Sequence, residues 1–433
     1  MREPLCASGI GVTAFIASLV DGGLGACIVR GFSRRRSTLR DPVRVLQRRN
    51  ADRHPNLRNA IRVCALFDRR LSRMTPCRLI HHGTEPGEIN MFVIFGAAGQ
   101  VGKVTATVLR EAGHAVRAVV RDRKQGEQLA RIGCEIALAD LLDTASVARA
   151  IEGAYAVQLL CPVPRAHADP AAEMRRMINS SVDALDANPP QRILALSDYG
   201  AEHASGTGIS TLFHYLETQL KTVDTQLTFL RSAEHMHNWA RMLPLMLARG
   251  VLPSLHHPVS KLYPTVAAQD VGVLAAELLL DDRALNVSPR VVSIESEQRV
   301  STFEVARTVG ELASSQVIAR EVPRGEWNAM LQAAGLGEQH ARLIVDLYDA
   351  HNAGRIDVEK EVSERYFGAT TLAQALAGIL PAAVAAVALA AGKTAATAKA
   401  PTVADAANAA ESTTAIASNA ANSATAASTT VSR

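Results

Sequence analysis

Cysteine is scarce in this chain: six of the 433 residues are cysteine, and four of those six lie in the first 90 residues. None of the four has the spacing of a metal-ligand set, and only Cys134 and Cys161 belong to the rest of the chain. Two cysteines do not make a disulfide framework in a domain of this size. The sequence therefore excludes a disulfide-stapled secreted protein and favours a reducing, cytoplasmic compartment.

Lysine is absent from residues 1–90, which hold sixteen arginines and seven acids. This leader carries a net charge of +9, and since the whole chain carries +4, the remainder carries −5. The arginines follow no helical face and do not alternate with aromatic residues, which argues against a nucleic-acid surface. The apolar stretch 10–20 lacks the positive flank of a signal peptide. We expect residues 1–90 to be an unfolded extension from a start assigned too early, with a targeting segment as the alternative.

Aromatic residues are also absent from residues 393–433, and from about residue 381 the composition narrows to alanine, threonine and serine. Such a segment cannot build a core, so we expect a disordered tail over 381–433. The apolar run from Leu372 is nearly long enough to span a bilayer. Because Gln374 and Pro381 interrupt it and alanine inserts weakly, a membrane anchor is the weaker alternative.

Between these segments, residues 91–122 have the pattern of one strand–turn–helix–strand unit. Apolar runs at 91–95 and 115–120 are typical of buried parallel strands. In such a unit glycines permit a tight turn and a close approach to a pyrophosphate, which the N-terminus of the helix then holds. We predict a nucleotide site here rather than a turn without a ligand, although the spacing is G-x-x-G-x-x-G rather than G-x-G-x-x-G. The predicted binding residues are Gly96, Ala97, Ala98, Gly99, Gln100, Val101 and Gly102.

Strands and helices go on alternating after this unit, which predicts an α/β fold: a Rossmann-type, doubly wound parallel sheet over residues 91–250. Further strands are expected at 135–138, 154–160, 192–197 and 227–231, and helices at 124–132, 146–151, 168–187 and 210–222. Beyond residue 250 the alternation loosens, and residues 251–380 are predicted to form a smaller, substrate-side subdomain. Its expected elements are a strand at 290–294 and helices at 269–280, 302–313, 327–334 and 338–352.

Several motifs of this body resemble those of a known family. They are GAAGQVG at 96–102, VVRDR at 119–123, ALAD at 137–140 with LSDYGA at 196–201, HYLETQL at 214–220 with LTFLRSAEHMHNW at 227–239, and YPTVAAQDVG at 263–272. Residues 91 to about 368 resemble the NmrA-like family of atypical short-chain dehydrogenases/reductases, which includes quinone and triphenylmethane reductases and redox-sensing regulators. The resemblance implies a bound NAD(P) and a substrate cleft above the carboxyl ends of the strands.

Cofactor choice depends on the end of the second strand, where Arg121, Arg123 and Lys124 gather. An arginine fork suits a ribose 2′-phosphate, whereas an acid such as Asp122 accepts hydrogen bonds from a free 2′-hydroxyl. Three cations against one acid favour NADP over NAD. The alternative interpretation is that these residues are a solvated charge cluster with no role in cofactor binding. Asp140 follows the third strand and, by the resemblance, lies near the adenine; a helix-capping aspartate is its alternative.

The catalytic candidates are Tyr215 and His214. Short-chain dehydrogenases use Tyr-x-x-x-Lys, in which the lysine lowers the tyrosine pKa. Here Tyr215 is followed four residues later by Gln219, which supplies no charge. Tyr215 is therefore a hydrogen-bond donor to a substrate or a plain packing residue. His214 and Glu217 share a helical face, either in the site or as a surface pair.

Two functions follow from these residues. The first is a reductase that passes hydride from NADPH to a small molecule, a quinone-like or other activated carbonyl compound. The second is a non-catalytic NADP sensor that acts through a protein partner. We expect no nucleic-acid or membrane partner. A metal is not expected either, because the histidines have no cysteine or carboxylate set beside them; they are His235, His237, His256 and His257.

Overall fold

The computed structural model describes residues 90–164, 167–281, 283 and 288–394. The predictions made for the leader and for residues 395–433 lie outside this part of the chain.

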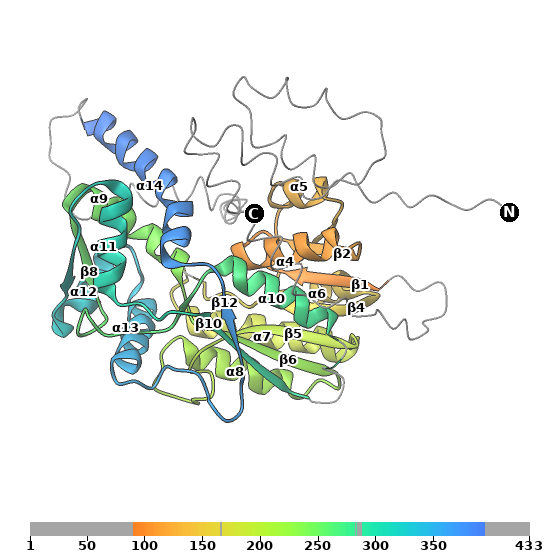
Figure 1. Ribbon diagram of the computed structural model, residues 1–433. Coiled ribbons are helices and arrows are strands. Elements are labelled where there is room, and N and C mark those ends of the chain that lie inside the picture. The colour runs from red at the N-terminus through yellow and green to blue at the C-terminus, as the bar shows by residue number, and fades with distance from the viewer. Residues whose placement is uncertain (1–89, 165–166, 282, 284–287, 395–433) are drawn as a thin grey trace, which may run out of the picture. The chain divides into compact units, whose positions relative to one another are not determined.

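An eight-stranded parallel sheet is the centre of the described residues (Figure 1). Its strands follow the order β12-β10-β6-β5-β4-β1-β2-β3. Each pair of neighbours is parallel. They are β1 (Met91–Phe95), β2 (Ala115–Val120), β3 (Glu135–Leu138), β4 (Ala154–Leu159), β5 (Arg192–Asp198), β6 (Gln226–Ser232), β10 (Arg290–Ser296) and β12 (Glu364–Gly368). The order reverses between β1 and β4, the switch point at which doubly wound sheets bind ligands. The predicted fold class is confirmed.

Helices cover both faces of the sheet, and this is why the strands are apolar on both sides. Phe92 and Ile94 of β1 belong to one core layer, and Val93 and Phe95 belong to the other. The first layer lies under α4 (Gln100–Glu111), α5 (Arg123–Arg131) and α10 (Ala268–Leu280). The second lies under α6 (Thr144–Ile151), α7 (Pro170–Ala187) and α8 (Ser210–Leu220).

Helix α10 fixes the position of α4. A Cβ added at Gly272 of α10 would lie 2.6 Å from the Cβ of Val104 and 2.7 Å from the carbonyl oxygen of Val101. The hydroxyl of Thr105 also donates a hydrogen bond to the Gly272 carbonyl at 3.2 Å. The two helices can therefore cross this closely only because residue 272 has no side chain.

A smaller layer follows β6 in the chain. It contains two short parallel pairs, β7 (Glu234–His235) with β9 (Thr265–Val266) and β8 (Val251–Ser254) with β11 (Ile318–Glu321). Its helices are η2 (Met236–Arg241), α9 (Leu243–Arg249), α11 (Thr302–Ala313), η4 (Arg324–Glu326), α12 (Trp327–Ala333) and α13 (Glu338–Asn352). Residues beyond 250 contribute to both layers, because α10, β10 and β12 belong to the main sheet. The predicted boundary at residue 250 therefore does not separate the two.

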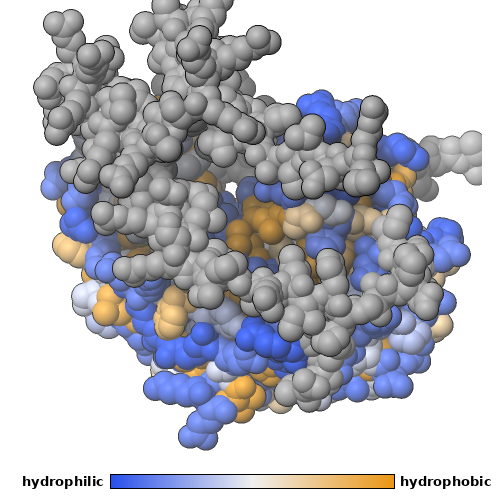
Figure 2. All heavy atoms as spheres, turned by 45° about the vertical axis from the view of Figure 1, so that its right-hand side comes forward, coloured by the Kyte–Doolittle hydropathy of each residue, from blue (hydrophilic) through white to orange (hydrophobic). Residues whose placement is uncertain are grey.

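The last described element is α14 (Leu372–Thr394), which continues through Pro381. The sequence predicts a structureless tail from residue 381, yet the helix runs on to Thr394, because alanine is the strongest helix former. Within the described residues no helix is long and apolar enough to cross a membrane. Figure 2 shows a mostly hydrophilic described surface, with hydrophobic residues gathered near the middle of that view.

Candidate functional site

The turn between β1 and α4 forms a cradle for an anion at the switch point. Gly96 has a φ of +70°, and its carbonyl accepts a hydrogen bond from the Gly99 N–H at 2.9 Å. Gly102 lies behind this turn, where an added Cβ would come within 2.4 Å of the Gly96 carbonyl oxygen. Only glycine allows the first turn of α4 to start this close to the end of β1.

The N-terminus of α4 is open to solvent. Gly99 and Gln100 are exposed, whereas Ala97, Val101 and Gly102 are buried. Gly99 is the N-cap residue and makes no side-chain hydrogen bond, and the first turn contains no acid. The N–H groups and the positive end of the helix dipole therefore meet no carboxylate from α4 itself. This geometry fits the pyrophosphate of a dinucleotide.

Three exposed cations, Arg121, Arg123 and Lys124, lie where β2 ends and α5 begins. Asp122 between them is the N-cap residue of α5, and its carboxylate accepts a hydrogen bond from the Lys124 N–H at 3.0 Å. The one acid of this group thus stabilises the start of a helix, which is the ordinary role of an aspartate at that position.

Asp140 organises the turn after β3. Its carboxylate accepts a hydrogen bond from the Leu142 N–H at 3.0 Å, and its carbonyl accepts one from the Ser146 hydroxyl at 3.1 Å. The cap of the following helix α6 is Asp143, not Asp140. Leu138 and Leu142 flank Asp140 and are 47% and 41% exposed. This end of the sheet therefore presents apolar surface beside a carboxylate.

On the other side of the switch point, Cys161 follows β4 and is fully buried. Burial raises the pKa of its thiol to about 12, although a hydrogen bond with Ser181 acts in the opposite direction. A thiol with so high a pKa is a packing group rather than a nucleophile at neutral pH.

The two catalytic candidates of α8 point to different places. The Tyr215 hydroxyl donates a hydrogen bond to Asn179 Oδ1 of α7 at 2.8 Å, and the guanidinium of Arg175, also on α7, lies over its ring. His214 Nδ1 lies 2.8 Å from the carbonyl oxygen of Ala201, in the turn after β5. His214 is therefore at the carboxyl end of β5, whereas Tyr215 lies between two helices. A catalytic role for either residue stays a prediction.

Glu217 does not form the surface pair with His214 that the sequence offers as an alternative, because its side chain is buried within the helical layer. Its carboxylate accepts hydrogen bonds from the Arg231 guanidinium of β6 at 2.7 and 2.9 Å. The Ser197 hydroxyl of β5 donates to the same carboxylate at 2.6 Å. Ser197, Glu217 and Arg231 come from three motifs of the predicted resemblance, and they meet in one buried network.

Two further carboxylates complete this network. Arg231 Nη1 lies 3.2 Å from Glu202 and 2.6 Å from Glu359, and its own side chain is 6% exposed. A buried guanidinium needs this number of partners, because each unpaired N–H would lose its hydration without compensation. The network ties β5, β6 and α8 to the loop before β12.

Asp198 is the last residue of β5, and sequence reasoning missed it. The residue is half-buried, and its carboxylate accepts a hydrogen bond from the Ser210 hydroxyl at the start of α8, at 2.8 Å. Burial raises the pKa of this carboxyl to about 7, repulsion from Glu234 and Glu202 acts in the same direction, and the Ser210 hydrogen bond opposes both. The available sequence signal was its position directly after an apolar strand.

A second carboxylate, Glu234, follows β6 and pairs with a histidine. His256 Nε2 lies 3.0 Å from it, and the Tyr348 hydroxyl lies 3.3 Å away. The His256 ring stacks on Tyr263 with 3.6 Å between centroids. Burial alone would raise the pKa of Glu234, but the hydrogen bond and charge of His256 outweigh it and the pKa is lowered. The carboxyl ends of β5 and β6 thus lie beside an unusual density of titratable groups.

The four histidines weighed as metal ligands do not converge. His235 contacts the Ser232 hydroxyl, while His256 contacts Glu234. Among the residues that the structure describes, no group of three or more histidine, cysteine, aspartate or glutamate side chains is arranged to hold a metal ion.

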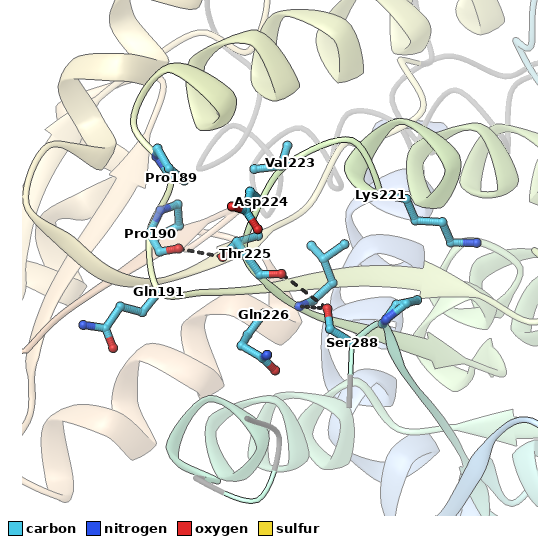
Figure 3. A pocket seen from close by; sticks show the side chains of 11 residues that line it. Pro189, Pro190, Gln191, Lys221, Val223, Asp224, Thr225, Gln226 and Ser288 are labelled. Atoms are coloured by element: carbon cyan, nitrogen blue, oxygen red, sulfur yellow. Dashed lines mark hydrogen bonds between the residues drawn. The ribbon is translucent and has the colours of Figure 1, made fainter. Parts of the chain in front are cut away.

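A cavity of about 850 Å³ lies at the opposite edge of the sheet, at the amino ends of β5, β6 and β10 (Figure 3). Its polar groups already bond to one another: the Thr225 hydroxyl donates to the Pro190 carbonyl at 2.6 Å, and the Ser288 hydroxyl accepts from the Leu227 N–H at 3.1 Å. None of the residues that line the cavity belongs to the cradle.

Residues 96–247 match a family model described as NAD(P)H-binding. Among solved structures, the triphenylmethane reductase of Citrobacter sp. complexed with NADP(H) is 20% identical, with a TM-score of 0.57; the match covers 67% of this chain and 100% of that one. An NADPH-dependent quinone oxidoreductase from Escherichia coli complexed with NADPH is 19% identical, with a TM-score of 0.57 and coverage of 67% and 99%. No curated protein matches the chain. The predicted resemblance is confirmed in the fold and in the family model.

Proposed function

We propose that the protein is a reductase that passes hydride from NADPH to a quinone-like or other activated carbonyl compound. The match of residues 96–247 to an NAD(P)H-binding family model supports this. The observation that carries the proposal is the glycine cradle at the switch point. There Gly102 leaves room for the turn, and the open N-terminus of α4 faces solvent without a carboxylate from its own first turn.

The cofactor would be NADPH rather than NADH. In support, Arg121, Arg123 and Lys124 are exposed at the end of β2, and the acid among them, Asp122, already caps α5. Both of the solved structures named above hold NADP(H). In this proposal residues 96–102 hold the pyrophosphate and Asp140 lies beside the adenine. NADPH supplies the hydride, and the chain's own residues orient it and exclude water.

Cofactor preference is tested with Arg121→Ala. Loss of one charge-assisted phosphate contact costs about 1.5–3 kcal/mol, so NADPH affinity should fall roughly ten- to a hundred-fold while NADH affinity stays nearly unchanged. Isothermal titration with both cofactors measures this difference. The matched control is Arg131→Ala at the other end of α5, whose arginine is 75% exposed and should affect neither cofactor. Equal losses for both cofactors would give Arg121 a structural role.

Hydride transfer to an activated acceptor depends chiefly on holding the two reacting rings together. It does not require a lysine, so Gln219 is compatible with reduction. Tyr215 can assist as a donor to the substrate only after its hydroxyl releases Asn179. His214 needs no such movement to reach the carboxyl end of β5.

The reaction is tested with the purified full chain, NADPH and a panel of quinones, aldehydes and triphenylmethane dyes, following the absorbance of NADPH. We expect turnover of at least one acceptor and no appreciable alcohol oxidation. Gly102→Ala is the control for turnover that does not depend on the site.

A second function, a sensor of NADPH that acts through a protein partner, is favoured by Gln219, which stands where Tyr-x-x-x-Lys has its lysine. The same panel separates the two functions. If the protein binds NADPH tightly but turns over no acceptor, the sensor function is supported and the reductase function is not.

A further inference from the structure

We infer that Asp198, at the carboxyl end of β5, donates the proton that the substrate oxygen takes up when the substrate is reduced. The inference rests on the proposed function and adds to it a residue on the strand, whereas the sequence points to Tyr215 on the helix.

The position of Asp198 follows from the sheet. The glycine cradle lies after β1, and the adenine half of a dinucleotide extends from it toward β2 and β3. The nicotinamide half consequently extends toward β4 and β5. Asp198 is the final residue of β5 and is paired in register with Ser232, the final residue of β6. Its carboxyl group is thus at the edge of the sheet to which the substrate must come.

The carboxyl group of Asp198 is held in place by a hydrogen bond. Ser210 donates a hydrogen bond to Oδ2 at 2.8 Å, which fixes the side chain against the N-terminus of α8. The residue is half-buried, in contrast to Ser197 before it and Tyr199 after it, which are buried. Of the three, Asp198 is therefore the one that is both titratable and partly exposed.

Burial is the main reason that this group keeps a proton, and two neighbouring carboxylates add to its effect. Glu202 in the turn after β5 and Glu234 of β7 both disfavour its ionisation, and burial acts in the same direction. Each of these carboxylates has its own partner: Arg231 lies 3.2 Å from Glu202, and His256 Nε2 lies 3.0 Å from Glu234. The pKa of Asp198 rises to about 7, which suits a general acid near neutral pH.

The step balances as follows. A carbonyl carbon accepts a hydride, with its electron pair, and the carbonyl π electrons move to the oxygen. The O–H bond of the Asp198 carboxyl breaks as the new O–H bond of the product forms, leaving a carboxylate. NADPH leaves as NADP⁺, and Asp198 recovers its proton from water. With a quinone, the hydride and its electron pair go to one carbonyl oxygen, the ring electrons shift to make the ring aromatic, and the other oxygen takes the Asp198 proton, so that the hydroquinone results.

The test uses the full chain and Asp198→Asn, which keeps the shape of the side chain and its contact with Ser210. General acids contribute roughly 10²–10⁴-fold, so kcat should fall at least about a hundred-fold while the Kd for NADPH is unchanged. The wild-type kcat should decline above about pH 7, and this limb should be absent from the variant. Ser210→Ala removes a hydrogen bond that stabilises the carboxylate and should move the limb to higher pH.

A second readout needs neither cofactor nor turnover. At pH 6 the infrared difference spectrum between wild type and Asp198→Asn should contain the carbonyl band of a protonated carboxyl group, and that band should vanish by pH 9. Asp186→Asn, an exposed aspartate of α7, is the matched control and should give no such band.

The outcomes are distinguishable. If the wild type binds NADPH but reduces no acceptor, the proposed function fails, and the infrared band then decides whether Asp198 carries a proton. The inference is overturned if the band is missing, or if Asp198→Asn retains the kcat and the pH profile of the wild type. A large loss of kcat in Tyr215→Phe, with the kcat of Asp198→Asn unaffected, would also overturn the inference, since the proton donor would then lie on α8.

Discussion

The two halves of the carboxyl edge hold their polar groups in different ways. On the side of β1, β2 and β3, the polar surface consists of backbone N–H groups at the start of α4 and of exposed charges such as Arg121. On the side of β5 and β6, it consists of side chains fixed by other side chains, among them Glu217 with Arg231 and Glu234 with His256. The first half depends on local backbone shape, and the second on contacts between distant segments.

This difference decides what a mutation does. The β1, β2 and β3 half is the one that the proposed function gives to the cofactor, and it is called the cofactor half below. A change of side chain there is expected to alter binding and to leave the core intact, unless it replaces a glycine on which the backbone conformation depends. In the β5 and β6 half, which the proposed function gives to the substrate and which is called the substrate half below, the same residues hold strands and helices together and set the local charge. Changes there are expected to couple stability with chemistry.

The largest effect is expected from Glu217→Ala, which removes a buried carboxylate from its guanidinium. Breaking a buried pair typically costs 3–5 kcal/mol, because the remaining charge is left without compensation. Glu202 and Glu359 still contact Arg231, so we expect about 3 kcal/mol of lost stability. Urea unfolding of the wild type and the variant measures it.

The neighbouring variant Thr218→Ala is the control, because Thr218 is exposed on the same helix and should change stability by less than about 0.5 kcal/mol. Similar losses in both variants would mean that helix propensity, and not the ion network, dominates.

A smaller effect, confined to the cofactor half, is expected from Gly102→Ala. The added Cβ would stand 2.4 Å from a backbone oxygen, so the turn after β1 must move away from α4. Overpacking of this kind costs about 1–3 kcal/mol. We expect NADPH and NADH affinity to fall together, roughly ten- to a hundred-fold, in a calorimetric titration.

Gly337→Ala is the matched control for this change. Gly337 has ordinary backbone angles and an added Cβ would meet no atom within 4 Å, so both affinities should stay at the wild-type value. Unchanged binding in Gly102→Ala would show that the turn has room to relax and that the cradle is not a rigid site.

The cofactor half could be predicted from the sequence because its determinants are contiguous. The glycines at 96, 99 and 102 and the apolar runs around them define strand, turn and helix within one segment. The strand 115–120 and the helices 302–313 and 338–352 have the bounds predicted. Each is a long periodic or apolar segment, in which local pattern and tertiary burial agree.

The substrate half could not be predicted, because its contacts join distant residues. Arg231 and Glu359 are 128 positions apart, and Tyr348 and Glu234 are 114 apart. The short strands β7, β8, β9, β11 and β12 were missed for the same reason. These segments have two to five residues each, and only their pairing with a neighbour defines them as strands.

The smallest expected effect on stability is that of Asp198→Asn, and it depends on pH. An unfolded aspartate has a pKa of about 3.9, whereas burial beside Glu234 and Glu202 raises the pKa of Asp198 to about 7. Below pH 4 the carboxyl is protonated in both states and contributes nothing. Between pH 4 and 7 the unfolded state loses its proton first, so the wild type is progressively destabilised as pH rises, and above pH 7 the loss is constant. Asparagine has no such loss.

After discounting for the partial exposure of this residue, we expect the variant to be more stable than the wild type by on the order of 1–2 kcal/mol at pH 8 and equal to it at pH 4. Urea unfolding at both pH values measures the difference, and Asp186→Asn should show none at either. A variant that is less stable than the wild type at pH 8 would mean that the carboxylate is stabilised where it stands, in which case the substrate half keeps Asp198 ionised as an anchor for Ser210.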